Sequence, residues 1–154
     1  MNLEEIDYIN TRRVLEAKWN TASDVIFKEL DKKLSSYVDT SKGRAMTFAS
    51  FMNCFQRPAN TGDSIKKLSC EMDSKISIDT ISSVIETINP DIVIFTSKYA
   101  WDSVGWKLAE KYRRNNILFD FVCHPGTGGR YWHNKNYKHG ASKFIEILNC
   151  ELIN

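Results

Sequence analysis

The amino-acid sequence predicts an α/β fold built on a short parallel sheet. Two runs of mostly apolar residues, 91–96 and 117–122, have the length and the β-branched or aromatic character of buried strands. Segments with helical apolar spacing precede the first run, separate the two runs and follow the second one at 140–152. Because a helix connects the two strands, we expect them to run parallel with a right-handed crossover.

The first part of the chain is expected to be helical and then rich in loops. Segments 3–18 and 21–37 have loosely helical apolar spacing, whereas the β-prone segment 45–51 predicts a first strand. Segment 57–63 is rich in turn residues and predicts an exposed loop, whose mobile continuation extends to about residue 75.

The helix before the first apolar run has the clearest pattern. Isoleucine and valine recur at helical spacing over 77–88, with Ser77 or Asp79 available to cap the first turn. The Asn-Pro pair at 89–90 ends this helix. The helix after the run ends in the basic segment 111–116, where cations suit the carboxyl end of a helix.

Length, charge and cysteine content narrow the class of protein. A chain of 154 residues suits one domain, with a helical part at 1–40 and an α/β core at 44–152. The 21 basic and 19 acidic residues give a net charge of +2, which neither requires nor excludes a nucleic-acid partner. The four cysteines contain no Cys-x-x-Cys pair, and no apolar run approaches the roughly 20 residues of a membrane helix. We therefore expect a soluble cytoplasmic protein with reduced thiols, whose oligomeric state the sequence leaves open.

Tryptophan and cysteine side chains are expected to serve the core. Trp101 and Trp106 fall in the helix after the first strand, and Trp19 falls at the end of the first helix, so each is predicted to pack inward. Cys54 is predicted to be a small core residue rather than a nucleophile.

The second apolar run ends on His124, which is followed by Pro125 and the glycine-rich segment 126–129. Ligand sites in open α/β sheets lie at the carboxyl ends of strands, so this histidine is a candidate functional residue. The alternative is a histidine whose ring is satisfied by the backbone at the end of a strand.

The sequence contains no recognisable metal or phosphate motif. Cys123 and His124 are neighbours on a strand and point to opposite faces, and His133 and His139 are poorly spaced for a shared metal ion. The glycines at 126–129 have no helix directly behind them, and neither a phosphate-binding loop nor a nucleophile elbow is present. We predict no metal and no cofactor.

Three motifs in this order resemble the uracil-DNA glycosylase superfamily. They are FASFMNCFQRP at 48–58, INPDIVIFTSKYAW at 88–101 and HPG at 124–126. In that family a strand ending in asparagine precedes a basic loop with proline, and a strand ending in His-Pro-Ser precedes the loop that faces DNA. The resemblance covers about residues 45–150. It implies a three-layer α/β/α sandwich and an enzyme of DNA repair that hydrolyses the N-glycosidic bond of a flipped, damaged base.

The resemblance also implies roles for individual residues. His124 would be catalytic, because its hydrogen bond would stabilise negative charge on the departing base. The amide of Asn53 would read the polar edge of that base, although a turn asparagine is the alternative. The other candidates are Phe55, Pro125 and Gly126 for substrate binding, and Arg57, Arg130, Tyr131, Trp132 and Lys135 for contacts to DNA.

The loop after His124 allows two interpretations. It combines glycine, positive charge and aromatic rings, which suits contacts to phosphates and bases. Alternatively, it is a surface loop in which Tyr131 and Trp132 cover the core.

Two departures from the family pattern concern catalysis. The chain lacks the family's first, glycine-containing motif, whose polar residue positions or activates the attacking water. The His-Pro-Ser signature reads His-Pro-Gly here, which removes a hydroxyl but leaves the amide of Gly126 as a donor. The alternatives are therefore a glycosylase-like enzyme and a catalytically degenerate or truncated member that binds nucleic acid or protein. An unrelated nucleotide-binding α/β domain is a third, more distant one.

Overall fold

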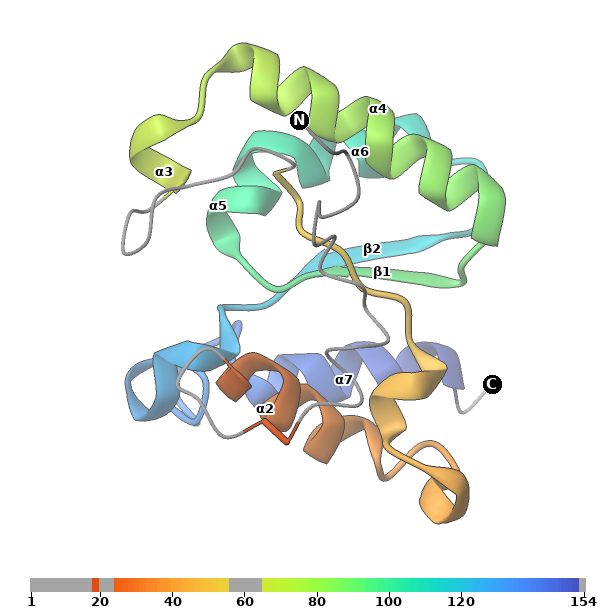
Figure 1. Cartoon of the computed structure of the whole chain (residues 1–154), viewed down its shortest axis with the longest axis vertical. Helices are drawn as coiled ribbons and strands as arrows, with labels where there is room; N and C mark the ends of the chain where they lie inside the picture. The colour runs from red at the N-terminus through yellow and green to blue at the C-terminus, as the bar shows by residue number, and fades with distance from the viewer. Residues whose placement is uncertain (1–17, 20–23, 56–64, 153–154) are drawn as a thin grey trace, which may run out of the picture. The chain divides into compact units, whose positions relative to one another are not determined.

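The computed structural model describes residues 18–19, 24–55 and 65–152. The described residues form a mixed α/β structure that is mostly helical and contains a two-stranded parallel sheet (Figure 1). The chain divides into two compact units, Met1–Met52 and Asn53–Asn154. The prediction of a single domain stays a prediction, since two compact units can belong to one domain. None of the described helices is long and apolar enough to span a membrane.

The first unit is helical where it is described. Its elements are α2 at Val25–Leu34, η3 at Thr40–Lys42 and η4 at Ala45–Phe48. Helix α2 confirms the helix predicted at 21–37, whereas the helix predicted at 3–18 lies outside the described residues, apart from Lys18.

Trp19 is buried in the first unit, as predicted. Its ring stacks on that of Phe27 at 6.1 Å between centroids, and the guanidinium of Arg44 lies 3.7 Å from its centre. A hydrogen bond of 2.9 Å from the amide of Met46 to the carboxylate of Asp31 joins η4 to α2.

The strand predicted at 45–51 is wrong. The chain forms a 3-10 turn over Ala45–Phe48 and has no regular structure from 49 to 53. Two adjacent residues, Ala45 and Met46, are both buried, which a helical turn allows but the alternation of a strand does not. The hydroxyl of Thr47 also donates to the carbonyl of Arg44, a local bond that favours the turn.

The second unit carries the sheet and the remaining helices. In chain order its elements are α3 (Ile65–Leu68), α4 (Glu71–Ile88), β1 (Ile92–Phe95), α5 (Lys98–Ala100), the π-helix η5 (Trp101–Gly105), α6 (Trp106–Lys111), β2 (Leu118–Phe121), η6 (Pro125–Arg130) and α7 (Ala141–Leu152). Both predicted apolar strands, the helical crossover between them and the final helix are confirmed. The strands pair in parallel, from Ile92 with Leu118 to Phe95 with Phe121, so their carboxyl ends lie at the same edge.

Helix α4 begins six residues before the predicted start at 77. Cys70 is its N-cap, and the amide of Cys70 donates to the carboxylate of Asp73 at 2.8 Å. Ser77 does not cap the helix, because its buried hydroxyl donates to the carbonyl of Asp73. The predicted mobile segment up to residue 75 is therefore wrong for 65–75. The predicted stop is confirmed, with Asn89 in the left-handed conformation at φ 45°.

Alternate residues of β2 face different elements. The ring of Phe119 stacks on Tyr112, which follows α6, and that of Phe121 stacks on Trp101 of η5, at 6.2 and 5.5 Å between centroids. Between them, the carboxylate of Asp120 pairs with the ammonium of Lys143 on α7 at 3.2 Å. Helices α4, α5 and α6 therefore cover one face of the strand pair, and α7 lies on the other face (Figure 1).

The two tryptophans after β1 behave differently. Trp101 is half-buried between Phe95 and Phe121, as predicted. The prediction for Trp106 is wrong, because its side chain is 51% exposed. Its indole N–H is satisfied on the helix surface by the carbonyl of Asp102, 3.0 Å away.

Gly105 leaves room for the ring of Trp101, which lies four residues earlier in η5. A Cβ at this position would lie 2.5 Å from Cε3 of Trp101 and 3.2 Å from Cδ2 of Phe95. We predict that Gly105→Ala lowers the free energy of unfolding by about 1–3 kcal/mol through overpacking, despite the better helix propensity of alanine. Urea denaturation measures this change.

Gly129→Ala is the matched control for this prediction. A Cβ at Gly129 meets no atom within 4 Å, so the variant should stay within about 0.5 kcal/mol of the parent protein. Equal stability of the two variants would contradict the packing described for Gly105.

Candidate functional site

The segment after β2 forms a closed loop, residues 124–138, which we call the His124 loop. A backbone hydrogen bond of 2.6 Å from the amide of Cys123 to the carbonyl of His139 ties its two ends together. Trp132 fills the inside of the loop with only 1% of its surface exposed, and its ring lies 6.0 Å from that of Phe144 on α7. Such loops, with close ends and an interior packed by their own side chains, are frequently functional.

His124 stands at the start of this loop as the N-cap of η6. Its Nδ1 accepts a hydrogen bond of 3.0 Å from the amide of Gly126. Because Nδ1 is the acceptor, the proton of the neutral imidazole lies on Nε2. The residue is exposed, yet partial desolvation of the ring lowers the pKa of His124 below its ordinary value. At neutral pH the ring is therefore an uncharged donor.

This geometry agrees in part with both interpretations of His124, and it differs from the expectation that the amide of Gly126 is a free donor. The backbone satisfies one ring nitrogen, as the structural alternative supposed, while the other nitrogen carries the proton. The amide of Gly126 is not available to a substrate in this conformation, because it donates to His124. Pro125 is buried and therefore does not offer a surface to a substrate.

The predicted DNA-contacting residues separate into exposed and buried ones. Arg130 and Lys135 are exposed and Tyr131 is half-buried, whereas Arg57 lies outside the described residues. Trp132 is buried and its ring lies beside that of Phe144 on α7, which favours the alternative in which this residue covers the core. Of the two adjacent aromatics, only Tyr131 remains accessible.

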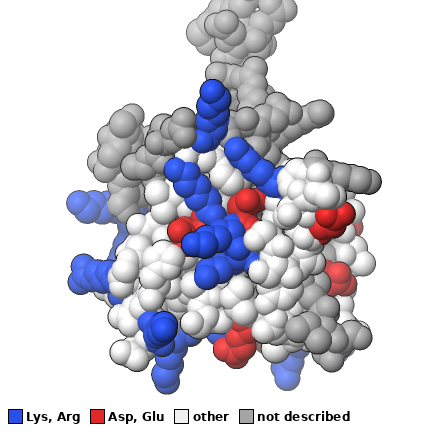
Figure 2. Space-filling view, turned by 90° about the horizontal axis from the view of Figure 1, so that it is seen from below, with Lys and Arg blue, Asp and Glu red and all other residues white. Residues whose placement is uncertain are grey.

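The His124 loop has an unusual charge composition. No aspartate or glutamate occurs between Asp120 and Glu146, whereas Arg130, Lys135 and Lys138 lie in the loop and are exposed. In the face drawn in Figure 2, acidic side chains lie beside several of the lysines and arginines. The loop itself carries only cationic side chains among its charged residues, on a chain that is close to neutral.

The two residues that follow Asn53 pack near the end of β1. Asn53 is exposed and irregular in structure, while Cys54 and Phe55 pack against the core that includes Phe95, the last residue of β1. The ring of Phe55 lies 5.6 Å from that of Tyr99 in α5, the helix that directly follows β1. Because β1 and β2 are parallel, this is the edge at which the His124 loop begins.

Two further residues near this edge, Cys54 and Tyr99, carry groups that could react or form hydrogen bonds. Burial raises the pKa of the Cys54 thiol to about 11, so the thiol stays protonated at neutral pH, and Cys54 packs against the core as predicted. Tyr99 was not predicted as a site residue, although its position just after a parallel strand could have indicated it. Its hydroxyl hydrogen-bonds to that of Ser69.

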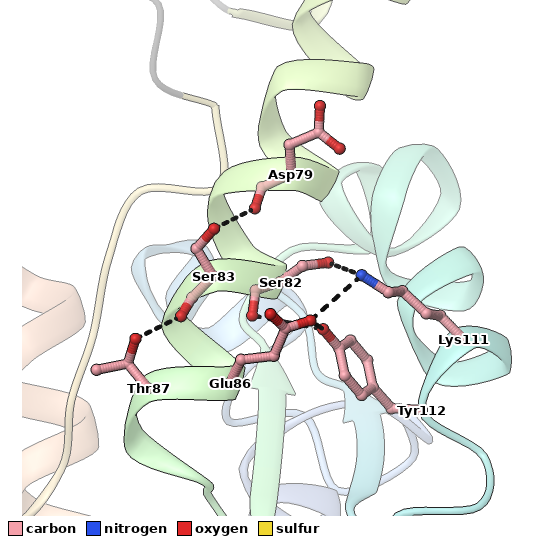
Figure 3. Close-up of polar contacts among 7 residues, drawn as sticks. All are labelled: Asp79, Ser82, Ser83, Glu86, Thr87, Lys111 and Tyr112. Carbon is pink, nitrogen blue, oxygen red and sulfur yellow. Dashed lines mark hydrogen bonds and ion pairs between the residues drawn. The ribbon is translucent and has the colours of Figure 1, made fainter.

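A second polar cluster joins α4 to the end of α6 (Figure 3). The ammonium of Lys111 contacts the hydroxyl of Ser82 at 2.9 Å and the carboxylate of Glu86 at 3.6 Å. The hydroxyl of Tyr112 donates to Glu86 at 2.7 Å. This bond lowers the pKa of Glu86, and the pKa of Lys111 is raised by its contact with Tyr112. Lys111 therefore stays charged and cannot act as a base for Ser82, so the cluster ties helices together.

Other candidate sites lie apart from His124. An open hollow of about 380 Å³ between α4 and α6 is lined by Glu71, Met72, Ser74, Lys75, Ile78 and Lys107. None of the predicted site residues lines it. Within the described ranges, no group of three or more His, Cys, Asp or Glu side chains could hold a metal ion.

Comparison of the chain with protein-family models, curated proteins and solved structures finds no match. The likeness to the uracil-DNA glycosylase superfamily thus rests on the three sequence motifs alone.

The tautomer and pKa of His124 can be measured directly. We predict that His124 titrates with a midpoint below 6.5 and that its neutral ring is protonated on Nε2. Two-dimensional NMR of the imidazole nitrogens, assigned with a His124→Gln variant, tests both statements. A midpoint at or above 6.5, or a proton on Nδ1, would contradict the geometry.

The lowered pKa also fixes the direction of a stability effect. Between the folded pKa and 6.5, the unfolded chain binds more protons at His124 than the folded protein does. The contribution of His124 to stability is therefore complete above 6.5 and decreases as the pH falls towards the folded pKa.

Proposed function

We propose that this chain is a uracil-DNA glycosylase-like protein that binds DNA through the His124 loop and recognises a flipped base at the carboxyl edge of the strand pair. The observation that carries the proposal is the hydrogen bond from Gly126 to Nδ1 of His124. Because this bond occupies Nδ1, the neutral ring has its proton on Nε2. His124 thus presents an uncharged Nε2–H donor at the start of a cationic loop.

A neutral donor suits the carbonyl oxygen of a base. A pyrimidine accepts hydrogen bonds at its carbonyl oxygens, and these oxygens gain negative charge when the bond to the sugar weakens. Asn53, two residues before Phe55, has a side-chain amide of the kind that can read the polar side of a base, since an amide contains both a donor and an acceptor. The helices on both faces of the strand pair support an abbreviated three-layer α/β/α sandwich as the framework.

Recognition without hydrolysis is the form of this function that the residues favour. Hydrolysis of an N-glycosidic bond requires a polar group that orients the attacking water. The segments that supply Asn53 and His124 contain no carboxylate, since neither 40–62 nor 121–145 includes an aspartate or glutamate. Asp102, in the π-helix that follows α5, is paired with Lys98. We therefore propose a role in binding, with the excision of the base as the competing outcome.

Oligonucleotide binding tests the proposal. We predict that a labelled strand with a single uracil binds more tightly than its thymine counterpart, and that His124→Ala weakens the uracil complex about fivefold, the loss of one hydrogen bond. Fluorescence anisotropy measures the affinities. His133→Ala, which removes an exposed histidine of the same loop, is the control and should retain the preference.

Two results would overturn this assignment. If the parent protein bound the uracil and thymine strands with equal affinity, the proposal of base recognition would be wrong. Excision of uracil that disappears in His124→Ala, measured by alkaline cleavage of the product strand, would show a hydrolytic enzyme instead of a binding protein.

A further inference from the structure

We propose that Tyr131 and Tyr137 form a stacking platform for the bases of single-stranded nucleic acid, flanked by the cations of the His124 loop. The inference rests on the proposed function for its ligand, nucleic acid, and adds the form of that ligand. Tyr137 belongs to none of the three sequence motifs and was not predicted as a contact.

The two rings contact each other, and the ring of Tyr137 also meets the edge of the His139 ring, 6.1 Å away between centroids. The centroids of the two tyrosine rings are 5.0 Å apart with an interplanar angle of 54°, and both residues remain partly exposed. The guanidinium of Arg130 lies 5.2 Å from the centre of the Tyr131 ring. The amide of Tyr137 donates to the carbonyl of Asn134 at 3.0 Å, which holds this part of the loop in a turn.

The burial of Trp132 explains why the platform is preformed. Trp132 anchors the loop from inside, and its carbonyl accepts a hydrogen bond of 2.8 Å from the amide of Ala141 at the start of α7. The adjacent Tyr131 is thereby held at the surface. A ring fixed in this way loses little conformational entropy when a base stacks on it.

The charges around the rings favour a polyanion. Arg130, Lys135 and Lys138 take part in none of the ion pairs found among the described residues, unlike Lys143, which pairs with Asp120 and Glu146. Exposed aromatic rings beside unpaired cations bind single strands, because the rings stack on base faces and the cations track the phosphates. A duplex hides its base faces in its own stack, so the rings favour a single strand.

The chain contains a matched control surface. Trp106 is exposed, whereas the two tyrosines are half-buried, and it has the ammonium of Lys107 5.7 Å from its ring centre. It differs in its surroundings, because its helix also carries the exposed acidic residue Glu110. A generic effect of removing an exposed aromatic ring would therefore appear in Trp106→Leu as well.

Fluorescence anisotropy with a fluorescein-labelled oligo-dT of about 15 nucleotides, compared with a duplex of equal length, tests the inference. We expect the full chain to bind the single strand more tightly than the duplex. Tyr131→Leu and Tyr137→Leu should each weaken single-strand binding about fivefold or more, whereas Tyr131→Phe, which keeps the ring, and Trp106→Leu should change it less than about twofold. Lys135→Gln should reduce the slope of log affinity against log salt by about 0.7.

Each outcome decides between the two proposals. No binding of either oligonucleotide at low salt would overturn both. Equal binding of duplex and single strand, with the tyrosine variants unaffected and the uracil preference intact, would overturn the platform alone. Single-strand binding that depends on the tyrosines but shows no uracil preference would support the platform and overturn base recognition. Urea denaturation of each variant separates a loss of binding from a loss of folding, and the leucine variant of the other tyrosine keeps the test valid if one leucine variant is unstable.

Discussion

The parallel pairing of β1 with β2 is the constraint on which the rest of the second unit depends. It brings the ends of both strands to one edge, so that α5 with Tyr99 and the His124 loop start side by side in the topology. It also sets the alternation along β2, with Phe119 and Phe121 facing the helices after β1 and Asp120 facing Lys143 of α7. A shift of one residue would turn Asp120 towards the aromatic rings, away from Lys143, and Phe119 and Phe121 towards α7, and so would be strongly destabilising.

In the His124 loop, buried residues that hold the loop in place alternate with neighbours whose side chains remain accessible. Trp132 points inward and fixes the loop, while Tyr131 stays accessible. Cys123 is buried and closes the loop through its amide, while His124 is exposed and has its proton placed on Nε2 by the backbone. This division resembles other functional loops, in which a rigid scaffold positions a few exposed polar groups. It also explains how a short sheet can support a defined site.

The sequence predicts those parts of the fold whose signals are local. The β-branched run at 92–95 and the isoleucine spacing of α4 identify a buried strand and an amphipathic helix without tertiary information. The 3-10 turn at Ala45–Phe48 escapes such reasoning, because its composition suits a strand and only packing places two adjacent residues inside. The start of α4 was missed because its N-cap is Cys70, a residue type with weak capping preference.

The candidate site is only partly predictable for the same reason. The position of His124 after a buried strand follows from the sequence, but its tautomer depends on a backbone amide two residues away. The identity of an aromatic residue does not determine its orientation. Trp106 is exposed although a core position is predicted, Trp132 follows the alternative in which it covers the core, and the sequence gives no signal for Tyr137.

The most direct test of the account is a map of the nucleic-acid contact on the folded chain. In a titration of ¹⁵N-labelled protein with oligo-dT, the account predicts that backbone amide shifts change mainly within residues 123–139 and at 53–55. The chemical shifts of amides around the hollow between α4 and α6, such as those of Lys75 and Lys107, should stay unchanged. Changes centred on α4 and α6, or no changes at all at saturating oligonucleotide, would contradict the account.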